Sequence, residues 1–306
     1  MKAYVVGGYI NHGGTLMAYH LGRILYESFG CECVIANVAD ETPDTSFYRY
    51  PYRFESIDIQ SMLKEIERED ILIANPSFSY HMFGLRCNCK KIMYIQHFNT
   101  FDVIDGFFDH YVCVSSIVSQ FVRKIYNIRA EVIPAFIQLD LIPFWEDWDK
   151  RSERGILAAG KHYFDLLLLH FGAEVRRKHP ELHYELFTLP NNIPHPEVVA
   201  HMARYRYFLV LSPLEGFGLM PLEAMACGCT VMGFDGCGGA DYMRDGINCA
   251  TTWYPDFEGL IDRVADTLGN PAKADALAKQ GSLDAMRYNQ RAFDQRWVDF
   301  FTKVLN

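Results

Sequence analysis

The chain has 306 residues, of which 50% are hydrophobic and 22% are charged, and its net charge is −9. This balance is ordinary for a globular protein of one or two domains, and no apolar run is long enough to span a bilayer. The acidic charge argues against a nucleic-acid partner and against docking on anionic lipid. Without a membrane-spanning run or a signal peptide, a cytoplasmic protein is expected, and its nine cysteines, an odd number, are then expected to be reduced thiols.

The N-terminal residues predict a βαβ unit. Lys2–Gly8 is an apolar run typical of a buried strand, and its apolar part is too short for a signal peptide. Gly13 and Gly14 precede a helix expected from Thr15 to Phe29, and the dinucleotide fingerprint G-x-G-x-x-G is absent. The glycine pair could let the backbone approach a pyrophosphate, or it could form a tight turn without a ligand.

An aromatic segment follows at residues 40–56. Its rings could form a platform for a sugar acceptor, or they could alternate along an edge strand. Residues 57–69 predict an amphipathic helix, and Ile71–Ala74 predicts a strand.

His97 comes directly after a predicted strand, Lys91–Ile95. In open α/β sheets, ligands bind beyond the carboxyl ends of the strands, so this histidine is placed to contact a ligand hydroxyl. It could equally be a loop histidine that the backbone satisfies. Ser115 or Ser116 is expected to cap a helix that begins near Ile117.

The central motif is Ser212–Thr230, SPLEGFGLMPLEAMACGCT, which follows an apolar strand. Glycines in the loop let a ligand approach, and the first amides of the next helix point at it, so the pattern predicts an anion site. Glu215 and Glu223 bracket this loop and could accept hydrogen bonds from sugar hydroxyls. Phosphate donors beside hydroxyl acceptors suit a sugar nucleotide. The alternative is a strand, loop and helix with no ligand.

Two segments, EGFGLMPLEAMACGCTV and GGADYMRDGINC, resemble the donor site of the retaining glycosyltransferases of family 4, the glycogen synthase-like family. The second segment predicts a short helix at 241–245. The resemblance implies an α/β protein of the GT-B fold, with two Rossmann-like domains facing across a cleft. The acceptor-binding domain would cover residues 1–150 and the nucleotide-sugar domain residues 151–306. The last helix, about 288–306, would pack back on the first domain.

The resemblance also assigns roles to residues. The implied donor-binding residues are Gly13, Gly14, Lys161, Glu215, Gly216, Phe217, Gly218, Leu219 and Glu223. His97, Glu215 and Lys161 would take part in catalysis. Lys161 stands where the family has an arginine, and the second basic residue of the family does not follow it. Lysine supplies charge without the bidentate fork of arginine, so this departure from the family bears on how firmly the diphosphate is bound.

The implied activity is transfer of a sugar from a nucleotide sugar to an acceptor hydroxyl with retention of anomeric configuration. The leaving phosphate oxygen would take the acceptor's proton, so no protein nucleophile, metal or cofactor is expected. UDP and GDP are the expected carriers, and a glycan, a lipid-linked molecule or a small molecule the expected acceptor. Two alternatives remain open: a degenerate GT-B protein that binds a nucleotide or a partner without turnover, and a transferase that modifies a nucleic-acid base.

Overall fold

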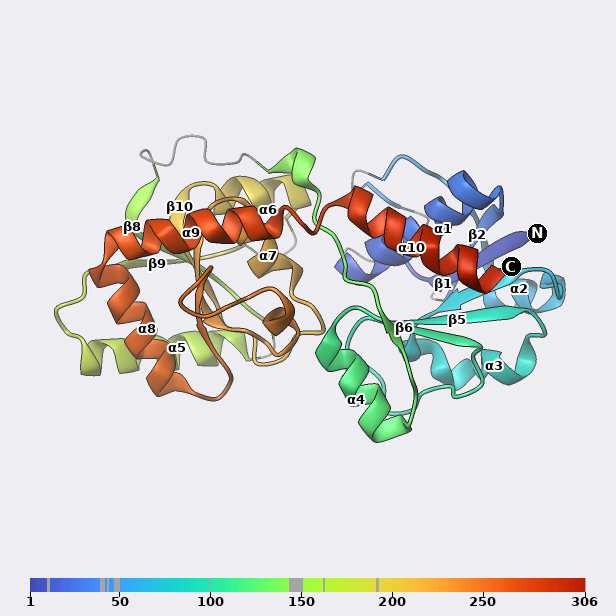
Figure 1. The fold of residues 1–306 in the computed structure, drawn as a ribbon, viewed down its shortest axis with the longest axis horizontal. Helices are drawn as coiled ribbons and strands as arrows, with labels where there is room; N and C mark the ends of the chain where they lie inside the picture. The colour runs from blue at the N-terminus through green and yellow to red at the C-terminus, as the bar shows by residue number, and fades with distance from the viewer. Residues whose placement is uncertain are drawn as a thin grey trace. The chain divides into compact units, whose positions relative to one another are not determined.

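The computed structural model describes residues 1–9, 12–38, 42, 44–46, 50–98, 100–142, 151–161, 163–190 and 193–305. These residues form two compact units, Met1–Phe136 with Arg291–Asn306 and Ile137–Gln290. Figure 1 shows the path of the chain through both units, coloured by residue number. The domain boundary expected at residue 150 lies outside the described residues.

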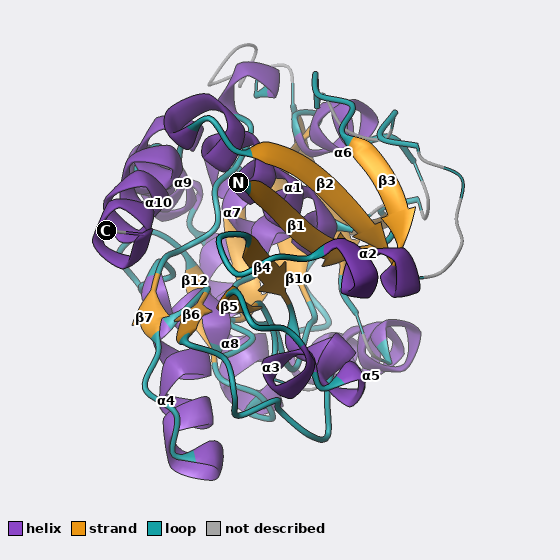
Figure 2. Ribbon diagram, turned by 90° about the vertical axis from the view of Figure 1, so that its right-hand side faces the viewer, coloured by secondary structure: helices purple, strands orange, loops and turns teal. Residues whose placement is uncertain are grey.

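The first unit is built on a seven-stranded parallel sheet in the order β3-β2-β1-β4-β5-β6-β7. Its strands are β1 (Lys2–Gly7), β2 (Glu32–Asn37), β3 (Glu55–Asp58), β4 (Ile71–Ala74), β5 (Lys90–Ile95), β6 (His110–Cys113) and β7 (Glu131–Val132). Figure 2 shows β1, β2 and β3 side by side. The strand order reverses between β1 and β4, which is where open α/β sheets place their ligand crevice.

Helices cover this sheet. They are α1 (Gly13–Phe29), α2 (Ile59–Glu65), α3 (Phe83–Arg86), α4 (Ser116–Tyr126) and α10 (Gln290–Leu305), with a 3₁₀ turn, η1 (Pro76–His81). Ser115 caps α4 as predicted, since its side chain accepts a hydrogen bond from the amide of Val118. Gly30 ends α1 in the left-handed conformation, with φ of 65°.

The C-terminal helix α10 belongs to the first unit, as the sequence predicted. Its apolar side buries Phe293 and Trp297, and the Trp297 ring lies edge-on to Tyr94 of β5 at 5.2 Å. On the polar side, Asp294 accepts a hydrogen bond from the buried guanidinium of Arg23 in α1. An apolar stripe and an ion pair therefore fix α10 to this unit.

The second unit has a five-stranded parallel sheet in the order β12-β11-β10-β8-β9. Its strands are β8 (Ser152–Ala159), β9 (Glu185–Thr188), β10 (Tyr205–Val210), β11 (Thr230–Phe234) and β12 (Ala250–Thr252). Its helices are α5 (Phe164–Lys178), α6 (His195–Met202), α7 (Leu219–Ala226), α8 (Phe257–Gly269) and α9 (Pro271–Ala285), with 3₁₀ turns η2 (Leu139–Leu141) and η4 (Gly238–Asp241).

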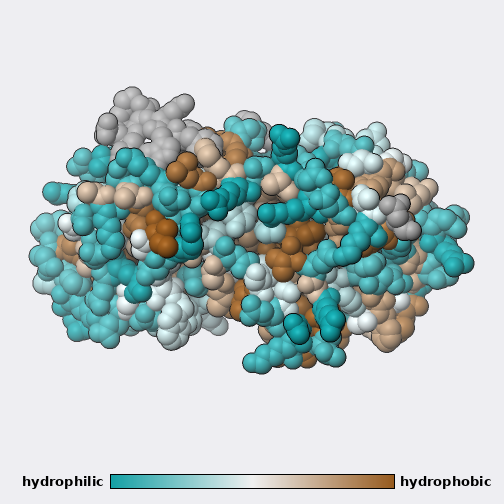
Figure 3. Space-filling view, in the orientation of Figure 1, coloured by the Kyte–Doolittle hydropathy of each residue, from teal (hydrophilic) through white to brown (hydrophobic). Residues whose placement is uncertain are grey.

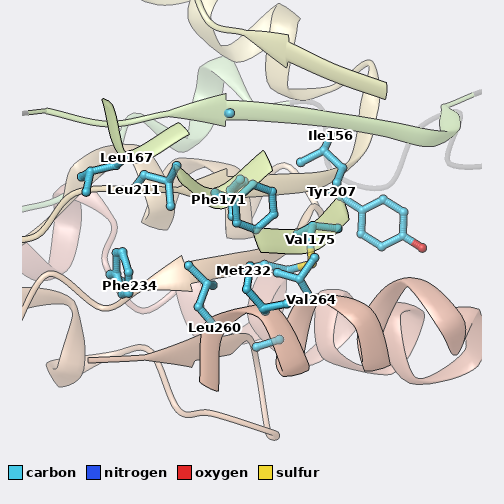
Figure 4. Close-up of a cluster of buried hydrophobic side chains, with 14 of the residues drawn as sticks. Ile156, Leu167, Phe171, Val175, Tyr207, Leu211, Met232, Phe234, Leu260 and Val264 are labelled. Atoms are coloured by element: carbon cyan, nitrogen blue, oxygen red, sulfur yellow. The ribbon is translucent and has the colours of Figure 1, made fainter. Parts of the chain in front are cut away.

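The core of the second unit lies between its sheet and helices α5 and α8. Figure 4 shows Phe171 and Val175 of α5 and Leu260 and Val264 of α8 gathered with Met232 of β11. All five side chains are fully buried or nearly so. Burying such side chains stabilises the fold by about 1.5–3 kcal/mol each relative to leaving them exposed. Helices α7 and α9 pack against each other and against the sheet at β11.

Some predicted elements were wrong in place or type. The helix expected over 57–69 is in fact the end of β3 followed by α2, which ends at Glu65. Edge strand β3 spans only four half-buried or exposed residues, too few for a clear period of two. The short helix expected at 241–245 is replaced by η4, which ends at Asp241.

The aromatic segment at 40–56 is described only in part. Tyr50 is buried and donates a hydrogen bond to the carbonyl of Tyr19 in α1, at 2.7 Å. The rings of Tyr52 and Phe54 stack at 5.6 Å, and both contact Tyr26. Residues 50–54 form no strand, and the rings of Tyr50, Tyr52 and Phe54 pack on α1. The acceptor platform stays a prediction.

On the face drawn in Figure 3, hydrophilic side chains cover most of the area. Among the helices described, none has both the length and the apolar character required to cross a bilayer.

Candidate functional site

The glycine-bearing loop at 211–218 lies at the carboxyl end of β10 and leads into α7. Ser212 accepts a hydrogen bond through Oγ from the amide of Lys161, which follows β8. Glu215 donates its amide to the carbonyl of Gly236, which follows β11, at 2.7 Å. Since β8 and β11 flank β10, the loop is tied to both neighbouring strand ends. The structure thus places it where parallel sheets bind ligands.

A buried tyrosine fixes the end of this loop. The hydroxyl of Tyr242 donates a hydrogen bond to the carbonyl of Gly218. Gly218 has φ of 85°, and a Cβ at this position would lie 3.0 Å from the Tyr242 hydroxyl. The ring of Phe217 packs against Tyr242 and Tyr288, so this side chain anchors the loop to both tyrosines. A larger residue at 218 would strain the backbone and displace the tyrosine.

Helix α7 begins at this loop without a side-chain cap. Gly218 is its N-cap, and no side chain among the described residues accepts from the first amides. The amides of Leu219 and Met220 belong to the first turn, where a helix lacks internal acceptors. Together with the helix dipole, they form a positive end that suits a phosphate.

Lys161 and Glu215 form an ion pair beside the loop. Nζ of Lys161 lies 3.1 Å from Oε2 of Glu215. The lysine side chain is 43% exposed and the glutamate side chain 7%. A largely buried carboxylate therefore holds a cation that a ligand can reach.

Glu223 has a partner that the sequence did not predict. Nε2 of His195, the first residue of α6, lies 2.7 Å from Oε1 of Glu223, in the second turn of α7. Burial lowers the pKa of His195, but the hydrogen bond and charge of Glu223, with a smaller contribution from Asp140, outweigh it and raise the pKa. The only signal in the sequence is the run Pro194-His195-Pro196.

Glu215 and Glu223 both lie near Tyr242. Burial raises the pKa of Tyr242 well above its usual range, and the charges of Glu215 and Glu223 both add to the increase. A cation, two carboxylates and a helix N-terminus thus lie around one loop of the second unit, and their binding of a donor stays a prediction.

In the first unit, Gly13 and Gly14 form the start of α1. His12 caps the helix by accepting from the amide of Gly14, at 3.2 Å. Gln96, which follows β5, donates a hydrogen bond to the carbonyl of Gly14 at 2.8 Å. A Cβ on Gly14 would lie only 2.6 Å from Oε1 of Gln96. A side chain at position 14 would therefore push the amide end of Gln96 aside, and sequence reasoning missed this contact.

His97 is half-buried at the same end of β5, and its ring contacts Phe98 at 5.3 Å between centroids. All nine cysteines are free thiols. Cys229 is buried beside α7, and burial raises its pKa to about 12. Such a thiol is a packing group rather than a nucleophile.

A cavity of about 350 Å³ lies elsewhere in the first unit. It is lined by residues at the amino ends of β6 and β7 and by the last turns of α10. The amino ends lie opposite the carboxyl ends that carry Gln96 and His97. The cavity is therefore at the opposite edge of the sheet from Gln96 and His97.

One family model matches the chain. Residues 173–284, all within the second unit, match the model described as "Glycosyl transferases group 1". The match includes the loop, α7 and both glutamates, and it begins after Lys161. No curated protein matches the sequence.

Solved structures share the fold along the whole chain. Sucrose-phosphate synthase from Thermosynechococcus elongatus has a TM-score of 0.74 at 12% identity, covering 99% of this chain and 98% of that chain. A glycosyltransferase from Rickettsia africae has a TM-score of 0.70 at 14% identity, covering 100% and 98%. HepE from Anabaena, solved with UDP, has a TM-score of 0.68 at 13% identity, covering 99% and 100%.

At such low identity these likenesses show the fold alone. The two parallel-sheet units and the C-terminal helix confirm the predicted GT-B fold. Together with the family match, the fold supports a glycosyltransferase.

Proposed function

We propose that the protein transfers a sugar from a nucleotide-sugar donor to an acceptor hydroxyl, with retention of the anomeric configuration. The observation that carries this proposal is the arrangement of Lys161, Glu215 and Glu223 around the open N-terminus of α7. Anion-binding and hydroxyl-binding groups lie side by side there, as a sugar diphosphate requires.

The donor would bind in two parts. The α7 amides and the ammonium of Lys161 would hold the diphosphate. Glu215 would accept from hydroxyls of the transferred sugar, and Glu223 from hydroxyls of the ribose. The Lys161–Glu215 pair would then share its ammonium with the incoming phosphate.

In the reaction, the bond between the anomeric carbon and the phosphate oxygen breaks, and a bond from the acceptor oxygen forms on the same face. The acceptor's proton passes to the leaving phosphate oxygen, so atoms and charge balance without a protein nucleophile. The negative charge that develops on the diphosphate would be stabilised by Lys161 and by the dipole of α7. In this proposal these groups, and not a metal ion, stabilise the leaving group.

UDP or GDP is the proposed carrier. HepE from Anabaena was solved with UDP, which supports testing UDP first. The proposed acceptor is a glycan, a lipid-linked molecule or a small molecule, and the proposed location is the cytoplasm. The roles of Gly13, Gly14 and His97 toward the donor stay predictions.

The first test is a thermal-shift screen of UDP, GDP, ADP, CMP and their common sugar conjugates. A ligand at 100 times its Kd stabilises the folded state by about 2.7 kcal/mol, which is readily seen. One nucleotide should raise the melting temperature of the wild type and not of Glu223→Ala. Glu197→Gln removes an exposed carboxylate on α6 and serves as the control.

The second test is turnover with the sugar conjugate that binds. Release of the nucleotide and an NMR spectrum of the first-formed product report activity and anomeric configuration. An inverted product would overturn retention. Binding without turnover would favour the degenerate GT-B alternative, and no shift with any nucleotide at millimolar concentration would contradict the proposed function.

A further inference from the structure

His195 is the first residue of α6. Proline residues stand on both sides of it, and Pro194 is the N-cap, with φ of −58°. The imidazole side chain is 19% exposed and the Glu223 carboxylate 8%. The prolines restrict the backbone on both sides of His195, and the contact between Nε2 and Oε1, at 2.7 Å, joins two largely buried side chains.

This contact is also the ring's only hydrogen bond to the described residues. Nδ1 of His195 is buried and has no hydrogen-bond partner among them. Among the described residues, Glu223 is therefore the hydrogen-bond partner of the imidazole. A charge-assisted hydrogen bond of this length is stronger than a neutral one, and it restrains the orientation of the carboxylate.

Glu223 has a second carboxylate oxygen. A carboxylate accepts through both oxygens, so engaging Oε1 fixes where the lone pairs of Oε2 point. Packing between α6 and α7 brings the histidine to one side of the carboxylate. A hydroxyl of a bound ligand then meets an acceptor that is already oriented, and a preorganised acceptor binds more tightly than a mobile one.

We propose that His195 is a positioning residue for nucleotide recognition. It binds Oε1 of Glu223 so that Oε2 accepts hydrogen bonds from the ribose hydroxyls of the carrier. The inference rests on the proposed function, in which Glu223 faces the ribose. It extends that function by making the preference for a ribonucleotide depend on a histidine from another helix.

The experiment measures nucleotide binding by titration calorimetry. The probes are UDP and GDP, each compared with its 2′-deoxy and 3′-deoxy counterparts. The proteins are the wild type, His195→Ala, His195→Gln and His195→Asn. Glutamine can place an amide donor near the position of Nε2, whereas asparagine is too short. This pair keeps the test decisive if the alanine variant does not fold.

We expect the wild type to prefer the ribonucleotide over a deoxy form by about tenfold, as the loss of one hydrogen bond to a charged acceptor predicts. The preference should fall to about twofold or less in His195→Ala and His195→Asn, with the deoxy affinity unchanged, and should return in His195→Gln. An unchanged preference in the alanine or asparagine variant would overturn the inference. So would an equal loss of affinity for both forms, which indicates a purely structural role.

The failure of the inference differs from the failure of the proposed function. If the wild type binds UDP or GDP without any preference for the ribonucleotide, the positioning role is overturned and nucleotide binding stands. If the wild type binds none of the probes, the proposed function is overturned and this inference with it.

Discussion

The ammonium of Lys161 lies 3.1 Å from the carboxylate of Glu215, and the two residues follow neighbouring strands, β8 and β10. The carboxylate is buried by its surroundings while the ammonium stays accessible. A cation held in this way is positioned before a ligand arrives, so little side-chain entropy is lost when a phosphate binds.

Removing this cation should impair catalysis. Lys161→Met should lower kcat/KM for the sugar nucleotide by about 100-fold, because one electrostatic donor to the leaving group is lost. Lys161→Arg should retain part of the activity. Steady-state kinetics measure both. Lys279→Met breaks an exposed ion pair on α9 and should leave kcat/KM unchanged. Full activity in Lys161→Met would exclude a role for this residue.

The hydroxyl of Tyr242 should stabilise the site loop. Tyr242→Phe removes its hydrogen bond to Gly218 and leaves a buried carbonyl without this donor. The free energy of unfolding, measured with urea, should fall by about 1–3 kcal/mol, and donor turnover should fall with it. Tyr254→Phe, at a partly exposed tyrosine of the same unit, is the matched control. Equal stability of both variants would show that the hydroxyl contributes nothing.

Gly14 and Gln96 should be energetically coupled. Gly14→Ala forces Gln96 to move and breaks its hydrogen bond to the Gly14 carbonyl. We expect a loss of at most about 1 kcal/mol in the free energy of unfolding, because the amide end of Gln96 is flexible and alanine favours the helix over glycine. In a Gln96→Ala background the same substitution should cost less, and a double-mutant cycle measures the difference. Gly106→Ala, where a Cβ meets nothing within 4 Å, is the control. Additive losses would contradict the coupling.

His20 should make the first unit sensitive to acid. Burial, with a smaller contribution from the charge of Arg23, lowers the pKa of His20 to about 3. In the unfolded chain the pKa of this histidine is about 6.5. Below this pH the unfolded chain therefore binds a proton that the folded chain does not bind. The free energy of unfolding should fall by up to about 1.4 kcal/mol per pH unit as pH decreases from 6.5 toward 3.

Urea titrations of the wild type and His20→Gln between pH 4 and 7 measure this contribution. The variant should show the flatter dependence on pH. His183→Gln replaces an exposed histidine and should follow the wild type. Parallel curves for the wild type and His20→Gln would rule out the proposed origin of the acid sensitivity.

His195 should show the opposite pH dependence. Its pKa is raised on folding, since Glu223 and Asp140 outweigh the effect of burial. Its contribution to stability is therefore fully present below pH 6.5 and is lost as pH rises through the folded pKa. The stability difference between the wild type and His195→Gln, followed by urea unfolding from pH 6 to 9, should shrink as pH rises. A stability difference that grows over this range would contradict a pKa of His195 that is raised on folding.

The sequence by itself determined the local elements of the site. The apolar run before the loop, the glycines within it and the helix-forming residues after it specify a strand, a loop and a helix N-terminus. Because a helix rises by a fixed amount per residue, Glu223 had to lie close to the Glu215 loop. Apolar strands separated by helical segments also determined the parallel sheets, since such strands are buried on both faces.

Only the tertiary structure decided which distant residues meet. Lys161 reaches Glu215 because β8 and β10 are neighbours, and His195 reaches Glu223 because α6 packs on α7. Gln96 reaches Gly14 across 82 positions of sequence. Periodicity is a local property that fixes the type of each element and its buried side. The order of strands and the packing of helices depend on non-local contacts, which no single segment of the sequence encodes.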